Sequence, residues 1–298
     1  MQKKKLFNPI IYLAIAMFLI STACVHKVIK LEITPEELSE KMINNPAFIE
    51  NANGENFCWH ARVGLDQFVE NYKLTKNTKW LDAGVRYFDF LIGKMAADPD
   101  GYKGWIGVYG YDDNYWQDAL VGDAILIEGI LDFSVLVLED NALKGKYVDK
   151  AKNYIEIAKR DFVEKWDKRG CWIDDGPYGG YIEYGKFLNK DNLKKWIEAP
   201  EELRTGISHP FNKQFDAARV CLRIYRITGD KFYRDRAEKI CNLFNGKIGE
   251  GIFLITWNGR DPAKKATYKG AYKIRWTIGT GYREFPLNLV HFSIVNSV

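Results

Sequence analysis

Residues 80–84 read Trp-Leu-Asp-Ala-Gly, and the same pattern returns as Tyr-Val-Asp-Lys-Ala at 147–151 and as Tyr-Arg-Asp-Arg-Ala at 233–237. Each copy has an aromatic residue, an Asp two positions later and a small residue two positions after that. The first and third copies align without a gap at an offset of 153 residues, and the pairs include Tyr72 with Tyr225, Asp82 with Asp235, and Gly93 with Gly246. Such spaced similarity is typical of a repeated supersecondary unit.

The residues around each copy predict a helical hairpin, in which an apolar helix precedes the pattern and an amphipathic helix contains it. The first leading helix carries one apolar stripe, formed by Phe57, Ala61, Leu65, Phe68 and Tyr72. Short polar residues at 75–78 predict the turn that follows it. The second leading helix, from about Asp118 to Leu138, is apolar on nearly every side, which indicates burial. The third hairpin is expected to turn at 228–230, and a further helix to begin at Thr34, before Pro35.

A single hairpin cannot bury its own apolar faces, so an array of hairpins is expected. One helix inside and one outside per hairpin is the arrangement of an all-α fold, the α/α toroid. We assign residues 34–298 to one such domain, with fewer than six hairpins. The last 25 or so residues, 273–298, show no clean helical stripe, and no helix is predicted there.

The start of the chain resembles a bacterial lipoprotein signal peptide. Lys3, Lys4 and Lys5 precede an apolar run from Ile10 to Ile20 that is too short to span a bilayer, and Ser-Thr-Ala-Cys follows at 21–24. The resemblance implies cleavage after residue 23, lipidation of Cys24, a tether over 25–33 and, because Val25 follows the cysteine, an outer-membrane location facing the periplasm. An uncleaved anchor or an ordinary secretory signal is the alternative.

Charge and cysteine content narrow the classes of partner. The formal net charge is +4, and removal of residues 1–24 leaves about +1, with no basic cluster interleaved with aromatics. Nucleic acid is therefore not an expected partner. Cys58, Cys171, Cys221 and Cys241 lack paired metal-ligand spacing, and the chain has no phosphate-binding loop, so neither a metal nor another cofactor is predicted. The sequence leaves open whether these cysteines form disulfides.

Two segments between hairpins, 98–117 and 166–185, are rich in Gly, Asp, Trp and Tyr, and both precede a leading helix. Long segments of this composition are usually functional. Because each of them precedes a leading helix, both should emerge on the same face of the array. With the hairpin periodicity and the stretch Tyr109 to Gly122, they give the chain a resemblance to the six-hairpin glycosidase superfamily, over residues 34–262. The resemblance implies a carbohydrate-binding cleft and the breakdown of glycans, most simply by hydrolysis.

Glycoside hydrolysis needs two carboxyl groups that flank the scissile bond. Asp113 is the first candidate, with Asp175 or Glu183 opposite it. Asp123 enters an apolar helix, where it must be paired or line the cleft. The candidate sugar-binding residues are the aromatic residues Trp59, Tyr115, Trp116, Trp172, Tyr181 and Trp257.

Two functions other than glycoside hydrolysis are compatible with the same sequence features. A polysaccharide lyase or epimerase acting on uronates would use His60 or His209 as the base, beside Tyr or Arg. Either histidine could instead cap a helix or lie in the packed wall. The second alternative is a glycan-binding lipoprotein, or an inactive homologue, without catalysis.

Overall fold

The computed structural model describes residues 33–45, 54–109, 112–189, 191–198, 209 and 211–249, without the side chains of 109, 112–114 and 245–249. The signal segment, the tether and the residues after 249 lie outside these ranges, so the structure does not test the predictions made for them.

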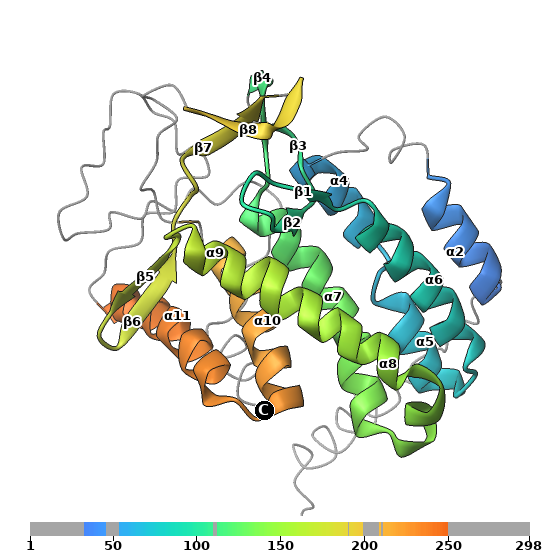
Figure 1. The fold of residues 1–298 in the computed structure, drawn as a ribbon. Helices are drawn as coiled ribbons and strands as arrows, with labels where there is room; N and C mark the ends of the chain where they lie inside the picture. The colour runs from blue at the N-terminus through green and yellow to red at the C-terminus, as the bar shows by residue number, and fades with distance from the viewer. Residues whose placement is uncertain are drawn as a thin grey trace, which may run out of the picture. The chain divides into compact units, whose positions relative to one another are not determined.

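The described chain is mostly helical, and short strands interrupt it in two places (Figure 1). The helices are α2 (Pro35–Ile43), α4 (Gly54–Arg62), α5 (Gln67–Thr75), α6 (Lys79–Gly93), α7 (Leu120–Glu139), α8 (Asn141–Ala158), the π-helix η1 (Lys159–Glu164), α9 (Lys165–Lys168), α10 (Phe211–Thr228) and α11 (Lys231–Gly249). The strands are β1 (Ala96–Ala97), β2 (Lys103–Gly104), β3 (Gly107–Tyr109), β4 (Asp112–Gln117), β5 (Trp172–Asp175), β6 (Tyr178–Tyr181), β7 (Lys186–Asn189) and β8 (Asn192–Glu198).

The expected hairpins are present, with one correction. The turns at 75–78 and 228–230 and the start of α2 at Pro35 are confirmed. The first leading helix, predicted as continuous, is divided into α4 and α5 around Gly64, whose φ of 84° no helix accommodates. The stripe survives the break, since Phe57, Leu65 and Phe68 are all buried.

Helix α7 lies at the centre and packs against α4, α8 and α10. Its sequence explains this position, because every residue from Leu120 to Glu128 is buried, as the all-round apolar pattern predicted. Helix α10 also packs against α11, and α6 packs against α5 and α2. The leading helices α4, α7 and α10 thus form one row, and each has its return helix beside it.

The small residue of the repeat lies where two helices approach closely. At Gly84 of α6, a Cβ atom would come within 2.9 Å of the Phe68 Cβ on α5. In the second copy Ala151 is fully buried, and its carbonyl accepts a hydrogen bond from Ser134 on α7. The aromatic residue links neighbouring hairpins, because the Tyr147 hydroxyl donates to Asp82 of the first copy at 2.8 Å.

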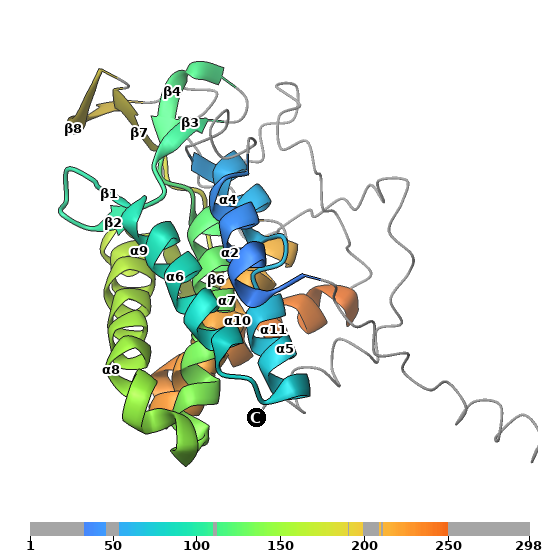
Figure 2. The same cartoon turned by 90° about the vertical axis from the view of Figure 1, so that its right-hand side faces the viewer.

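Short strands lie within the segments predicted as rim loops and directly beside them, so the all-α prediction was wrong in this detail. β1 pairs with β2 and β5 with β6, while β3, β4, β7 and β8 form one antiparallel sheet. Trp116 of β4 is opposite Leu188 of β7, which joins the segment before α7 to the segment before α10. Because β7 follows the second predicted segment, 166–185, this pairing does not test the prediction that the two segments emerge on one face. Both views show the four-stranded sheet beyond the ends of the helices (Figures 1 and 2).

Candidate functional site

An open hollow of about 310 Å³ lies between the end of α9 and the segment that connects β6 to β7. Its wall consists of Arg169, Gly170, Cys171, Ile182, Glu183, Tyr184, Gly185, Lys186 and Glu198. Among the predicted catalytic residues, Glu183 is the one that reaches this hollow.

Both oxygens of the Glu183 carboxylate are held. Gln117, at the end of β4, donates from Nε2 to Oε1 at 2.8 Å, and the Nδ1 of His209 lies 3.2 Å from Oε2. The Glu183 side chain is still 28% exposed, so it remains accessible from the hollow. A carboxylate fixed by two neighbours and open on one side can exchange a proton with a bound molecule.

His209 is held just before α10. Its backbone N–H donates to the Tyr181 carbonyl at 3.1 Å, and its own carbonyl accepts from Gln214. Burial lowers the pKa of His209, against the smaller raising effect of Glu183, and nearby Lys213 lowers it further. The ring is therefore neutral at neutral pH. A neutral ring with its proton on Nδ1 donates to Glu183.

Aromatic rings lie along the same side of the hollow. Tyr184 meets Trp196 of β8 edge to face, with their ring centroids 5.5 Å apart. Both rings lie close to the guanidinium of Arg169, at 5.1 and 5.4 Å, and Trp166 of α9 lies 4.9 Å from it. Tyr184 and Trp196 are half-buried.

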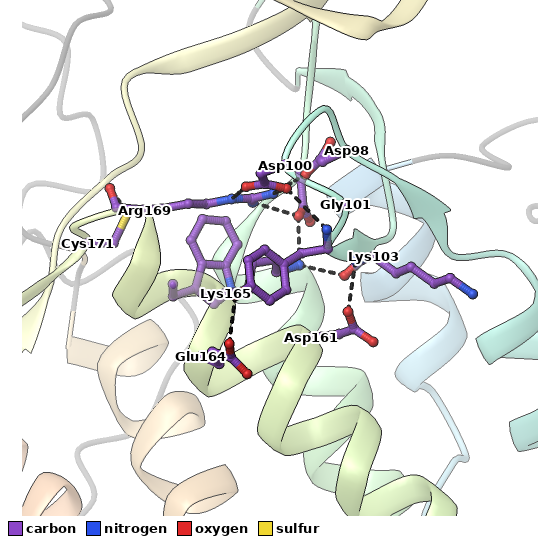
Figure 3. A network of polar contacts seen from close by, with 12 residues as sticks. Asp98, Asp100, Gly101, Lys103, Asp161, Glu164, Lys165, Arg169 and Cys171 are labelled. Carbon is purple, nitrogen blue, oxygen red and sulfur yellow. Dashed lines mark hydrogen bonds and ion pairs between the residues drawn. The ribbon is translucent and has the colours of Figure 1, made fainter.

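The guanidinium of Arg169 donates hydrogen bonds to several carboxylates of its own chain (Figure 3). Its Nε donates to Asp100 at 2.8 Å, Nη1 donates to Asp118 at 2.8 Å, and Nη2 donates to both Asp98 and Asp100. Arg169 borders the hollow, but each of its three nitrogens already donates to a carboxylate of the chain.

The other predicted carboxylates lie apart from Glu183. Asp175 is exposed at the tip of the β5–β6 hairpin, paired with Tyr178, about 10 Å along the strand from Tyr181. Asp113 lies on β4 four residues from Gln117, which is about 13 Å in an extended strand. The Asp113 side chain is outside the described part of the chain. The structure therefore does not bring Asp113, Asp175 and Glu183 together at the hollow.

Asp123 is paired and does not line the cleft. Its side chain is fully buried, and its Oδ2 accepts from Lys165 at 2.6 Å and from Trp166 at 3.1 Å. His60 is exposed, and its Nδ1 lies 2.8 Å from the Asn56 carbonyl one turn earlier in α4. His60 therefore lies on the exposed surface of α4, neither in a packed wall nor at the start of a helix, while His209 is the histidine that meets a carboxylate.

The predicted sugar-binding residues divide into groups. Trp172 and Tyr181 pack against Arg236 of α11, and Tyr181 is fully buried. Trp59 is half-buried and donates to Glu55, which also pairs with Lys213. Tyr115 and Trp116 are half-buried on β4, where Tyr115 meets Phe187 edge to face. Trp257 and Cys24 lie outside the described residues.

Sequence reasoning missed Arg169, Tyr184 and Glu198, which line the hollow. It also missed Gln117 and Trp196, which contact the lining residues Glu183 and Tyr184. A signal for Trp196 and Glu198 was present. The polar run Asn-Lys-Asp-Asn at 189–192 separates Phe187-Leu188 from Trp196-Ile197, which is the pattern of a β-hairpin. The role of Gln117 carried no such signal, because it depends on contact with a residue 66 positions away.

Four cysteines of the described chain are free thiols: Cys58, Cys171, Cys221 and Cys241. Burial raises the pKa of Cys171 to about 12. Within the described ranges, no three His, Cys, Asp or Glu side chains are grouped so that they could hold a metal ion. No helix in the same ranges is long and apolar enough to cross a membrane.

No family model matches the chain, and no curated protein matches it.

Proposed function

We propose that this protein acts on glycans and hydrolyses a glycosidic bond, with Glu183 as a proton donor and acceptor. The observation that carries the proposal is the position of Glu183 on an open hollow, with one carboxylate oxygen held by Gln117 and the other by His209. The row of leading helices with return helices beside them supports the further proposal that the hairpins form part of an α/α toroid.

Glu198 is the proposed second carboxyl group. It lines the same hollow, from the end of β8, opposite Lys186 of β7. Hydrolysis needs one carboxyl group to protonate the leaving oxygen and another to activate water or to attack the sugar. Tyr184 and Trp196 supply aromatic faces against which the C–H face of a sugar ring can stack.

The charges around the hollow argue against a uronate as the substrate. Glu183 and Glu198 are negative, Lys186 is positive, and the charge of Arg169 is already matched by Asp98, Asp100 and Asp118. Burial raises the pKa of Tyr184 to about 12, which makes its phenolate a poorly populated base at neutral pH. The two carboxylates of the lining, Glu183 and Glu198, would repel the carboxylate of a uronate, so hydrolysis of a neutral glycan fits better.

Glu183→Gln should lower the turnover number by about 100-fold or more, because the amide keeps the size of the side chain and cannot transfer a proton. The assay incubates the full chain with a panel of neutral and uronate-containing polysaccharides and measures new reducing ends and the ultraviolet absorbance of unsaturated uronates. Asp175→Asn, at the exposed hairpin tip, is the control and should retain activity.

The two readouts separate the candidate functions. Reducing ends that appear without the ultraviolet band support hydrolysis, and the ultraviolet band indicates elimination instead. Full activity in the Glu183→Gln variant would show that Glu183 is not the proton-transfer group. Glycan binding without either product would leave a binding protein.

A further inference from the structure

Behind the wall of the hollow, three carboxyl groups and two cations are buried together (Figure 3). The side chains of Asp98, Asp118 and Asp123 are at most 1% exposed, and those of Lys165 and Arg169 at most 2%. Fully ionised, these five groups would carry one negative charge in excess. A buried uncompensated charge is strongly unfavourable, so the cluster must gain a positive charge or a proton.

The cations satisfy one side of the cluster. Lys165 donates to Asp118 at 2.7 Å and to Asp123 at 2.6 Å, while Arg169 donates to Asp118 at 2.8 Å and also to Asp98. Lys165 donates in addition to the Lys103 carbonyl of β2 at 2.8 Å. Asp118 is therefore the carboxylate that both cations contact.

The remaining oxygens of the three carboxyl groups lack a hydrogen-bond donor. These are the Oδ1 atoms of Asp98, Asp118 and Asp123, which are buried and have no donor among the described residues. Asp98 and Asp118 both accept hydrogen bonds from the guanidinium of Arg169, which holds the two buried carboxyl groups next to each other. Two ionised carboxylates at such a distance repel, whereas one protonated and one ionised carboxyl group form a strong hydrogen bond.

We propose that Asp98 and Asp118 share one proton at neutral pH, and that this proton fastens the β1–β2 segment to the residues just before α7 and helps to hold Arg169 in the wall of the hollow. The proton removes one unit of the excess negative charge in the cluster. It also supplies the donor that the Asp98 and Asp118 oxygens lack. The inference does not depend on the proposed function, since it concerns how the wall is held.

The surroundings indicate which partner carries the proton. Burial, followed by the charge of Asp118, raises the pKa of Asp98 to about 8. Burial alone would also raise the pKa of Asp118, but Lys165 and Arg169 outweigh it and lower that pKa to about 2. The proton therefore resides on Asp98 and is donated to Asp118.

The other charged or titratable groups that face the pair come from each neighbouring element, and they are Asp100, Asp123, Lys165, Arg169, Cys58, Cys171 and Tyr184. Burial raises the pKa of both thiols and of Tyr184, so these three stay neutral. Burial also raises the pKa of Asp123 to about 8, which acts on stability in the same direction as Asp98.

The folded state holds a proton on Asp98. In the unfolded chain Asp98 has an ordinary pKa near 4 and gives this proton up. The free energy of unfolding should therefore decrease as the pH rises from about 4 to about 8, and level off above that. An ordinary salt-bridged Asp would produce the opposite slope.

Asp98→Asn tests the proposal in the full chain, because an amide N–H can donate to Asp118 at every pH. This variant should unfold like the wild type at about pH 5 and lose less stability than the wild type up to about pH 8. Asp118→Asn is the matched comparison. It removes the ionised acceptor shared by Lys165 and Arg169, and should be less stable than Asp98→Asn across the whole range.

Infrared spectroscopy of aspartate-labelled protein provides the direct readout. The wild type at about pH 6 should show a protonated buried carboxyl group that disappears above about pH 8, and Asp98→Asn should lack one such group. The proposal is overturned if the wild type shows no protonated carboxyl group, if Asp98→Asn leaves the spectrum unchanged, or if the two variants are equally destabilised.

Discussion

At the scale of single residues, the buried cluster explains why position 104 is Gly. The Asp118 carboxyl group occupies the space where a Cβ atom on Gly104 would lie, so a methyl group there must displace a side chain that holds both Lys165 and Arg169. Polar side chains held from several directions cannot move aside as the end of an apolar side chain can.

Gly104→Ala should therefore lower the free energy of unfolding by about 1–3 kcal/mol, the usual cost of overpacking. Urea denaturation measures this change. Gly145→Ala is the control, because Gly145 lies on α8 with no atom within 4 Å of its added Cβ. That substitution should raise stability by about 0.5–1 kcal/mol through helix propensity. Equal stability of Gly104→Ala and wild type would contradict the close contact.

At the scale of elements, neighbouring hairpins are joined by side chains of the repeated pattern. The Tyr147 hydroxyl on α8 is placed to donate to Asp82 of α6, and it lies 3.2 Å from the Thr78 carbonyl. Further along α8, Lys150, one turn on, and Tyr154, two turns on, both donate to Asp89. The repeat thus determines how one hairpin meets the next as well as the hairpin itself.

Tyr147→Phe should destabilise the protein by about 1 kcal/mol, because it removes a hydrogen bond to a charged acceptor and retains the buried ring. Thermal and urea unfolding both report this effect. Tyr178→Phe, at the exposed β5–β6 turn, should change stability by less than about 0.5 kcal/mol. If the two variants behaved alike, the contact between hairpins would contribute nothing measurable.

At the scale of the whole molecule, the proposed activity on glycans agrees with the proposed export of the chain. The signal-like residues 1–24 lie outside the described ranges, so this proposal rests on the sequence around Lys3 to Cys24. An exported lipoprotein would present its glycan site in the periplasm, attached to the outer membrane through Cys24.

Cys24→Ala should abolish incorporation of radiolabelled palmitate and release the protein from the membrane fraction, when the full chain is expressed in a bacterium. Cys241→Ser, in α11, should leave labelling unchanged, since this residue has no part in the lipoprotein pattern. Labelling that persists without Cys24 would exclude lipidation there.

The sequence by itself determined the helical hairpins, because the apolar stripes, the turn residues and the small residues of the repeat are local signals. It also predicted that the two aromatic segments share a face, since both precede leading helices. It did not predict the break at Gly64, because one glycine within a helical stripe is tolerated more often than not.

Only the tertiary structure decided which residues form the site. Glu183 gains its role from Gln117 and His209, and Arg169 loses its availability to Asp98, Asp100 and Asp118, all through contacts between distant parts of the chain. Such contacts arise when β4 pairs with β7 and α9 packs beneath the β1–β2 segment. No local periodicity encodes them, because the free energy of a buried charge depends on which partners the fold brings to it.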